Sequence, residues 1–173
     1  MKKTIVSLGL ALTLSYGETQ AEYIQGLFSL SIGDYKTALI IFEDLAAKGD
    51  ANSQSYLGLL YLNGEGVKQD YKIAKDWNEK AAAQNHKDAQ FNLGYIYYNG
   101  YGVNTNYKIA KDWFEKAAAQ GHSMAQNNIG VMYVKGQGVK QDKKVAKRWY
   151  GEACDSGEQM GCDNYKKLNQ QGY

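Results

Sequence analysis

The sequence predicts an all-α protein, a right-handed α/α solenoid of tandem helix-turn-helix repeats. One observation is a segment, Leu57–Tyr61, whose pattern returns at residues 93–97 and 129–133, each time after 36 residues. The same shift relates three Gly-x-Gly-Val segments, which begin at Gly64, Gly100 and Gly136. A fixed period of 20 to 50 residues is typical of stacked repeats that bury one continuous core. The shared period therefore predicts three equal repeats over residues 52–159.

The first half of each repeat has the spacing of an amphipathic helix. In the central repeat Ala89, Leu93, Gly94 and Tyr97 fall three or four residues apart, which places them on one helix face. The glycines of the following Gly-x-Gly segment adopt positive φ at low cost. We therefore expect a first helix, followed by a chain reversal.

The second half of each repeat predicts a helix that packs against the first. Ala110, Trp113 and Ala117 form its apolar stripe, and Gly121 is typical of a helix end. Small Gly94 and Ala110 allow the two helices to approach closely, so we expect Trp113 to fill the space beside them. The tryptophans repeated at this place, all predicted to be core residues, are Trp77, Trp113 and Trp149.

The N-terminus reads as a secretory signal peptide. A basic start, residues 1–3, precedes an apolar run over residues 5–14, and small Thr19 and Ala21 precede Glu22. We expect cleavage ahead of Glu22; the alternative is a buried or amphipathic first helix. The apolar run is too short to anchor the chain in a membrane.

The remaining segments complete the predicted organisation. Residues around Gly26 and Ala38 read as a helical hairpin whose loop is four residues shorter than those of the other repeats. Beyond the last repeat, a polar segment reads as a capping helix with one face in water. The expected boundaries are a signal peptide at 1–21, a first repeat at 22–51, repeats at 52–87, 88–123 and 124–159, and a cap with a tail at 160–173.

The repeat pattern resembles the Sel1-like repeat family, a relative of the tetratricopeptide (TPR) repeats. The resemblance covers nearly the whole predicted mature chain and implies a scaffold or adaptor that binds other proteins. It is carried in the central repeat by Ala89, Leu93, Gly94, Tyr97, Gly100, Gly102, Val103, Ala110, Trp113, Ala117, Ala118 and Gly121.

Two cysteines, Cys154 and Cys162, are the only ones in the chain. An even count in an exported chain favours a disulfide over a free thiol or a metal site. Their place at the junction of a second helix and the next first helix resembles that in the Helicobacter cysteine-rich proteins. Some members of that group are described as penicillin-binding, weak β-lactamases, so this resemblance implies a weak β-lactamase as an alternative function.

Composition and motifs argue against several functions. The net charge of +2 is too balanced to favour nucleic acid or an anionic membrane as partner. No serine has a lysine three residues on, as serine β-lactamases require. His86 and His122, one repeat apart, are expected to be turn residues too far apart to share a metal ion. We therefore expect no catalytic residues, no metal and no cofactor.

The most informative positions vary between repeats while their neighbours stay fixed. They recur at helical spacing on the first helices, which line the concave surface in TPR-like solenoids. We interpret them as a groove in which a monomeric, periplasmic or secreted scaffold binds a protein or peptide. A structural subunit of a cell-envelope assembly is the further alternative. The predicted groove residues are Ser55, Leu59, Leu62, Phe91, Tyr95, Tyr98, Asn99, Asn127, Val131 and Val134.

Overall fold

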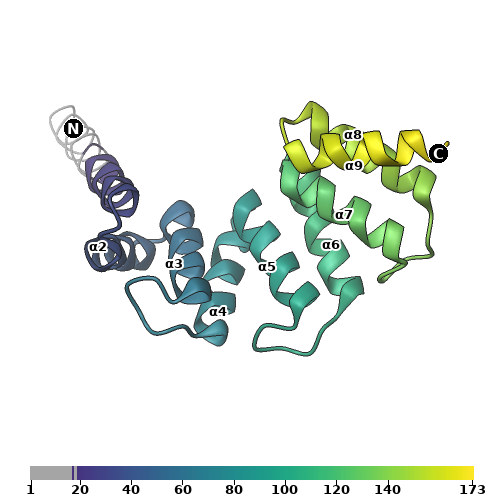
Figure 1. The fold of residues 1–173 in the computed structure, drawn as a ribbon. Helices are drawn as coiled ribbons and strands as arrows, with labels where there is room; N and C mark the ends of the chain where they lie inside the picture. Colours follow the sequence, from purple (N-terminus) through teal and green to yellow (C-terminus); the bar gives the residue numbers. More distant parts are fainter. Residues whose placement is uncertain (1–16, 18) are drawn as a thin grey trace, which may run out of the picture.

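The computed structural model describes residue 17 and residues 19–173, and within them the fold is a curved stack of helices (Figure 1). The predicted all-α solenoid is confirmed. The basic start and apolar run of the predicted signal peptide lie outside the described residues. A helix over residues 19–31 precedes α2 (Tyr35–Ala47), α3 (Ala51–Asn63), α4 (Tyr71–Ala83), α5 (Lys87–Asn99), α6 (Tyr107–Ala118), α7 (Ser123–Lys135), α8 (Lys143–Asp155) and α9 (Gln159–Gln170).

The helices begin at side chains that recur every 36 residues. A first helix is capped by the residue before it: Asp50 accepts the backbone N–H of Ser53 at 2.7 Å, and His86 and His122 take its place in the next two repeats. Such caps satisfy backbone donors that have no partner within the helix. The caps of the second helices follow the same period; they are Asp34, Asp70, Asn106 and Asp142. The period therefore extends back to the first hairpin, although its loop is shorter.

The Gly-x-Gly loops join one repeat to the one before it. Gly100 ends α5 in the left-handed conformation with φ of 76°, and Gly102 also has positive φ, at 66°. A Cβ on Gly102 would lie only 2.7 Å from the Cβ of Tyr71, at the start of the preceding second helix. The second glycine is therefore required both by its backbone conformation and by this inter-repeat contact.

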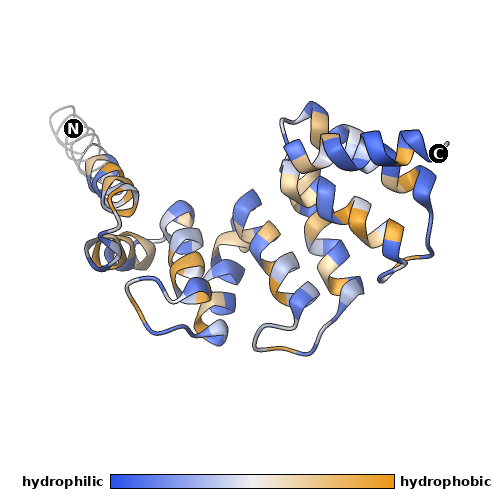
Figure 2. Cartoon of the chain, in the orientation of Figure 1, coloured by the Kyte–Doolittle hydropathy of each residue, from blue (hydrophilic) through white to orange (hydrophobic). Residues whose placement is uncertain are grey.

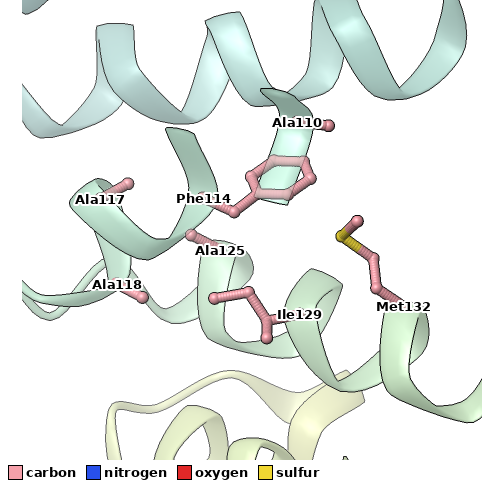
Figure 3. Packing of buried hydrophobic residues seen from close by; sticks show 7 residues of the cluster. All are labelled: Ala110, Phe114, Ala117, Ala118, Ala125, Ile129 and Met132. Carbon is pink, nitrogen blue, oxygen red and sulfur yellow. The ribbon is translucent and has the colours of Figure 1, made fainter. Parts of the chain in front are cut away.

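The core combines alanines with large apolar residues such as Ile129 and Met132 (Figure 3), and in each repeat one further side chain packs against the glycine of the first helix. In the central repeat this side chain is Phe114, which is fully buried; a Cβ on Gly94 would lie 2.5 Å from its Cδ1 atom. The prediction that Trp113 fills this space is wrong. Trp113 is half-buried, with the Lys116 Nζ atom 4.0 Å from its ring centroid. The equivalent residues opposite Gly58 and Gly130 are Asn78 and Tyr150.

The stack ends in a polar helix tied down by a disulfide. Helix α9 packs against α8 and α7, and most of its length is hydrophilic (Figure 2). Cys154 of α8 and Cys162 of α9 form a disulfide bond, as the sequence predicts. That this segment caps the stack remains a prediction. Among the described helices, none combines the length and apolar character needed to cross a membrane.

Candidate functional site

A cavity of about 320 Å³ lies between the first helices of successive repeats. We call it the first-helix cavity. Side chains of α3 and α5 form its walls, the helix over residues 19–31 and the start of α7 close its ends, and two helix caps contribute to its rim. Its lining residues are Tyr23, Asn52, Ser55, Tyr56, Leu59, His86, Asp88, Phe91, Asn92, His122 and Met124.

The walls of the first-helix cavity are largely apolar. Leu59 and Phe91 are half-buried, and Met124 leaves 42% of its surface exposed. The Phe91 ring stacks on the His122 ring with centroids 4.4 Å apart and planes inclined by 14°. This stack holds the Phe91 ring against the His122 ring at one face of the cavity.

An aromatic strip continues from the cavity along α5. Tyr95 stacks near Phe91 at a centroid distance of 6.3 Å and meets the Tyr101 ring edge-on at 5.6 Å. Tyr101, in the loop after α5, stacks in turn on Tyr71 at 4.9 Å. Tyr95 is 37% exposed. The strip therefore offers amphipathic aromatic surface, of the kind enriched at protein interfaces, next to the cavity.

The polar groups of the cavity are held by hydrogen bonds. His86 Nε2 lies 3.0 Å from Asn52 Oδ1. His122 Nε2 lies 3.4 Å from an Asp88 carboxylate oxygen. Asn92 Nδ2 donates to Asn78 Oδ1 at 3.0 Å, so its own carbonyl oxygen is the group it can offer to a ligand. Within the described residues no group of three or more His, Cys, Asp or Glu side chains is placed to hold a metal ion.

Both histidines act as neutral helix caps. His86 Nδ1 accepts the Ala89 N–H at 3.4 Å, and His122 Nδ1 accepts the Ala125 N–H at 3.3 Å. A ring nitrogen that accepts a hydrogen bond carries no proton. Burial lowers the pKa of both imidazoles below the ordinary value of 6.5 and outweighs the opposite effect of Asp88. The histidines are therefore structural caps that also line the cavity.

This arrangement predicts a loss of stability in mild acid. Because the folded pKa of each histidine is lowered, the stabilising contribution is present above pH 6.5 and declines as the pH falls below it. Protonated Nδ1 can no longer accept, and a lost cap costs about 1 kcal/mol. Thermal unfolding followed by circular dichroism at pH 7.5 and 5.5 is expected to show a lower Tm at pH 5.5. In His86→Asn/His122→Asn the decrease is expected to be smaller, since Asn106 caps α6 without titrating; equal decreases would contradict this account.

The structure separates the predicted groove residues into two groups. Ser55, Leu59 and Phe91 line the first-helix cavity, and Tyr95 adjoins it. Ser55 is only 5% exposed, so it lies at the bottom of the cavity and not on an open surface. Asn99, at the end of α5, is exposed and donates to the Tyr95 carbonyl at 2.9 Å.

The second group lies between repeats and corrects the predicted helix faces. Leu62 is 6% exposed and packs with Ala74 and Ile96. Tyr98 contacts the rings of Tyr107 and Phe114, and its hydroxyl donates to Gln137 Oε1 at 2.7 Å. These residues lie on the same helix face as the cavity residues but nearer to the C-terminal end of the helix. There the following repeat covers them.

The same burial holds for the last repeat. Val131 and Val134 pack against the cluster of Tyr150 and Leu168. Asn127 is 5% exposed and accepts a hydrogen bond from Asn164 of α9 at 3.0 Å. Because the capping helix lies over this part of α7, the predicted groove does not continue into the last repeat.

Several cavity residues were missed by the sequence analysis. Apart from Tyr23, they lie at the caps and in the first two turns of the first helices, and the sequence analysis assigned only His86 and His122 to a turn. A signal was present: Asn52, Asp88 and Met124 occupy one repeat position and differ in all three repeats, and Tyr56 is replaced by Asn92 and Asn128 at another. The missed residues are Tyr23, Asn52, Tyr56, His86, Asp88, Asn92, His122 and Met124.

Comparison with known proteins identifies the repeats. A family model described as Sel1 repeat matches residues 51–86, 87–122 and 123–158. No match was found among curated proteins. A protective antigen with an SLR fold from uropathogenic Escherichia coli is 33% identical over 91% of this chain, with a TM-score of 0.81. A Sel1 repeat protein from Oxalobacter formigenes is 32% identical over 87% of this chain, with a TM-score of 0.79.

The relatives also differ from this chain in length. The chain spans 35% of the E. coli protein and 60% of the O. formigenes protein. The Helicobacter pylori cysteine rich protein B is 20% identical, and the match covers 74% of this chain and 95% of that one, with a TM-score of 0.62, which shows a shared fold. The repeat matches cover more than half of the chain, and the chain belongs to the Sel1 repeat family.

Proposed function

We propose that this protein is an exported scaffold that binds a peptide segment of a partner protein on the concave surface formed by its first helices. Sel1 repeat proteins generally mediate contacts between proteins. The observation that carries the proposal is the first-helix cavity, whose apolar walls come from successive repeats and remain open to solvent. Clefts with apolar walls and a few fixed polar groups are the usual form of binding sites.

Exposed side chains beside the cavity support the same surface. Met124 at its end and Tyr95 on the adjoining strip are large hydrophobic residues that packing between repeats leaves 42% and 37% exposed. Exposed apolar surface favours association, because binding of a partner removes this surface from contact with water. A peptide that lies along α5 would contact both residues.

The binding proposal is tested by removing these two side chains. Tyr95→Ala/Met124→Ala is expected to weaken partner binding by about 2 kcal/mol or more, the size of an interface hot spot. Its free energy of unfolding is expected to change by less than about 1 kcal/mol, because both residues are exposed. Partner capture from cell-envelope extract, quantified by mass spectrometry beside urea unfolding, measures both quantities.

The matched control is Ile73→Ala, which removes an exposed apolar side chain from α4, a second helix. This control is expected to retain the partner. If it loses the partner while Tyr95→Ala/Met124→Ala retains it, binding takes place on the second-helix side and the proposal is wrong.

Export is the second part of the proposal. The basic and apolar leader supports it, and so does the Cys154–Cys162 disulfide, since disulfides are typical of oxidising compartments. Cleavage ahead of Glu22 retains Tyr23 and with it the complete lining of the first-helix cavity. N-terminal sequencing of the protein from the envelope or the medium is expected to begin at Glu22. A chain that begins at Met1 would contradict export by this route.

A further inference from the structure

Positive charge is distributed unequally between the two kinds of helix. Helix α3 contains no lysine or arginine, and α5 and α7 contain one each, at their first and last residues, Lys87 and Lys135. The first-helix surface between these ends carries no cationic side chain, and Lys87, which acts on both His86 and His122, is the nearest cation to the cavity lining on these helices. The second helices α4, α6 and α8 carry Lys72, Lys75, Lys80, Lys108, Lys111, Lys116, Lys143, Lys144, Lys147 and Arg148.

The first-helix cavity contains one formal charge, and it is negative. The Asp88 side chain is 55% exposed and is the only carboxylate among the lining residues. His86 and His122 add no positive charge at neutral pH, because each Nδ1 accepts a backbone N–H. Among the lining groups, the Asp88 carboxylate and the Asn92 carbonyl oxygen are thus available as acceptors for a cationic group.

The occupant that matches this cavity has a cationic head on an aliphatic stem. Lysine and arginine have this form, and they bury the stem along apolar surface while the charged head reaches polar groups. The walls that would receive the stem are Leu59, Phe91 and Met124. An acidic side chain would instead bring a second negative charge close to Asp88.

We propose that the first-helix cavity binds a lysine or arginine side chain of a partner peptide, with the charged head at Asp88 and the stem along Phe91 and Met124. The inference rests on the proposed function, because it assigns the class of residue that the concave surface recognises. It also predicts that the lysine-rich second helices are not the binding surface for this peptide.

Selection from a random 12-residue peptide library displayed on phage tests the inference. The selection uses the full mature chain at pH 7.5, and bound peptides are then tested against Met124→Trp, which fills the end of the cavity without adding charge. Peptides that lose binding to this variant depend on the cavity. We expect these peptides to share a lysine or arginine flanked by apolar residues.

The contribution of the charge is then measured on one selected peptide by fluorescence anisotropy. Replacing its basic residue by the neutral isostere citrulline (for arginine) or norleucine (for lysine) is expected to weaken binding about tenfold, in the range of a hydrogen bond to a charged group. With the Asp88→Asn variant, the basic peptide and its neutral analogue are expected to bind with nearly equal affinity. The matched control Asp112→Asn, on the exposed side of α6, is expected to preserve the difference in affinity.

The outcomes distinguish the two proposals. Cavity-dependent peptides without enrichment in basic residues, or equal affinity of the neutral isostere, would overturn this inference and leave the binding function in place. Enrichment in aspartate or glutamate would overturn it in the same way. If no selected peptide depends on the cavity, both the inference and the concave binding surface are wrong.

Discussion

Replacing Phe114 with alanine is expected to lower the free energy of unfolding by about 3–5 kcal/mol, the range for buried aromatic residues. Phe114 is fully buried, with 0% of its surface accessible to solvent. It fills the space that Gly94 leaves between α5 and α6. Close-packed helices cannot collapse fully into the resulting cavity. Urea unfolding followed by circular dichroism measures the change.

Two further variants test whether the core has been assigned correctly. Trp113→Ala is expected to cost only about 1–2 kcal/mol, as for a half-buried residue whose removal leaves no closed cavity. A larger loss for Trp113 than for Phe114 would contradict the packing described above. As a single substitution, Gly94→Ala is expected to destabilise the protein, because its Cβ would lie 2.5 Å from Phe114 Cδ1. When Phe114 is also replaced by alanine, the same substitution is expected to be tolerated. This coupling would show direct contact between the two positions.

Removing the disulfide is expected to destabilise the end of the stack. In Cys154→Ala/Cys162→Ala a cross-link that spans eight residues is lost, which corresponds to about 2–3 kcal/mol on the chain-entropy model. Alanine is suitable at the first position because Ala118 occupies the matching place in the preceding repeat. The effect is expected to concentrate in α9, since a terminal helix packs on one side only.

Hydrogen–deuterium exchange resolves where stability is lost. Backbone amides of α9 are expected to exchange faster in the disulfide variant, whereas those of α5 and α6 are expected to keep their protection. Uniformly faster exchange along the chain would show that the repeats unfold together and that the disulfide does not act locally. Unchanged exchange in α9 would show that its packing against α8 is sufficient.

The fold was largely predictable because the same pattern of helix residues and loop glycines is repeated every 36 residues. The 36-residue shift aligns the Gly-x-Gly loops, and their left-handed glycines determine where each first helix ends. The cysteine pair was predictable for a similar reason, since only two cysteines are present. Features determined within one repeat, or by residue type alone, are therefore accessible from the sequence.

Contacts between repeats were harder to predict. Sequence spacing did not distinguish Trp113 from the next residue, Phe114, because both lie near the apolar stripe of α6 and only the packing of Gly94 selects one of them. Tyr98 varies between repeats, as a ligand-binding residue would, but its hydroxyl donates to Gln137 of the next repeat, at a position that also varies between repeats. Variation between repeats therefore indicates either a ligand or a changed neighbour.

Only part of the candidate site was predictable from the sequence, because spacing identifies a helix face but not the contacts between repeats. Phe91 and Leu59 were found from their spacing on the first helices, and both line the cavity. His122 was assigned to a turn, and its second role followed only from the stacking of its ring on Phe91. Side chains that serve as helix caps and also face a cavity cannot be identified from the repeat pattern alone.

Site-specific photo-crosslinking tests the central claim most directly. The photoreactive residue p-benzoylphenylalanine is placed singly at Tyr95, at Met124 and at Ile73 in the full chain, which is then irradiated in cells that make its natural partners. The account predicts one shared cross-linked partner for the positions at Tyr95 and Met124, and its absence for the position at Ile73 on the second-helix side. A partner cross-linked from Ile73 alone would contradict binding on the concave surface.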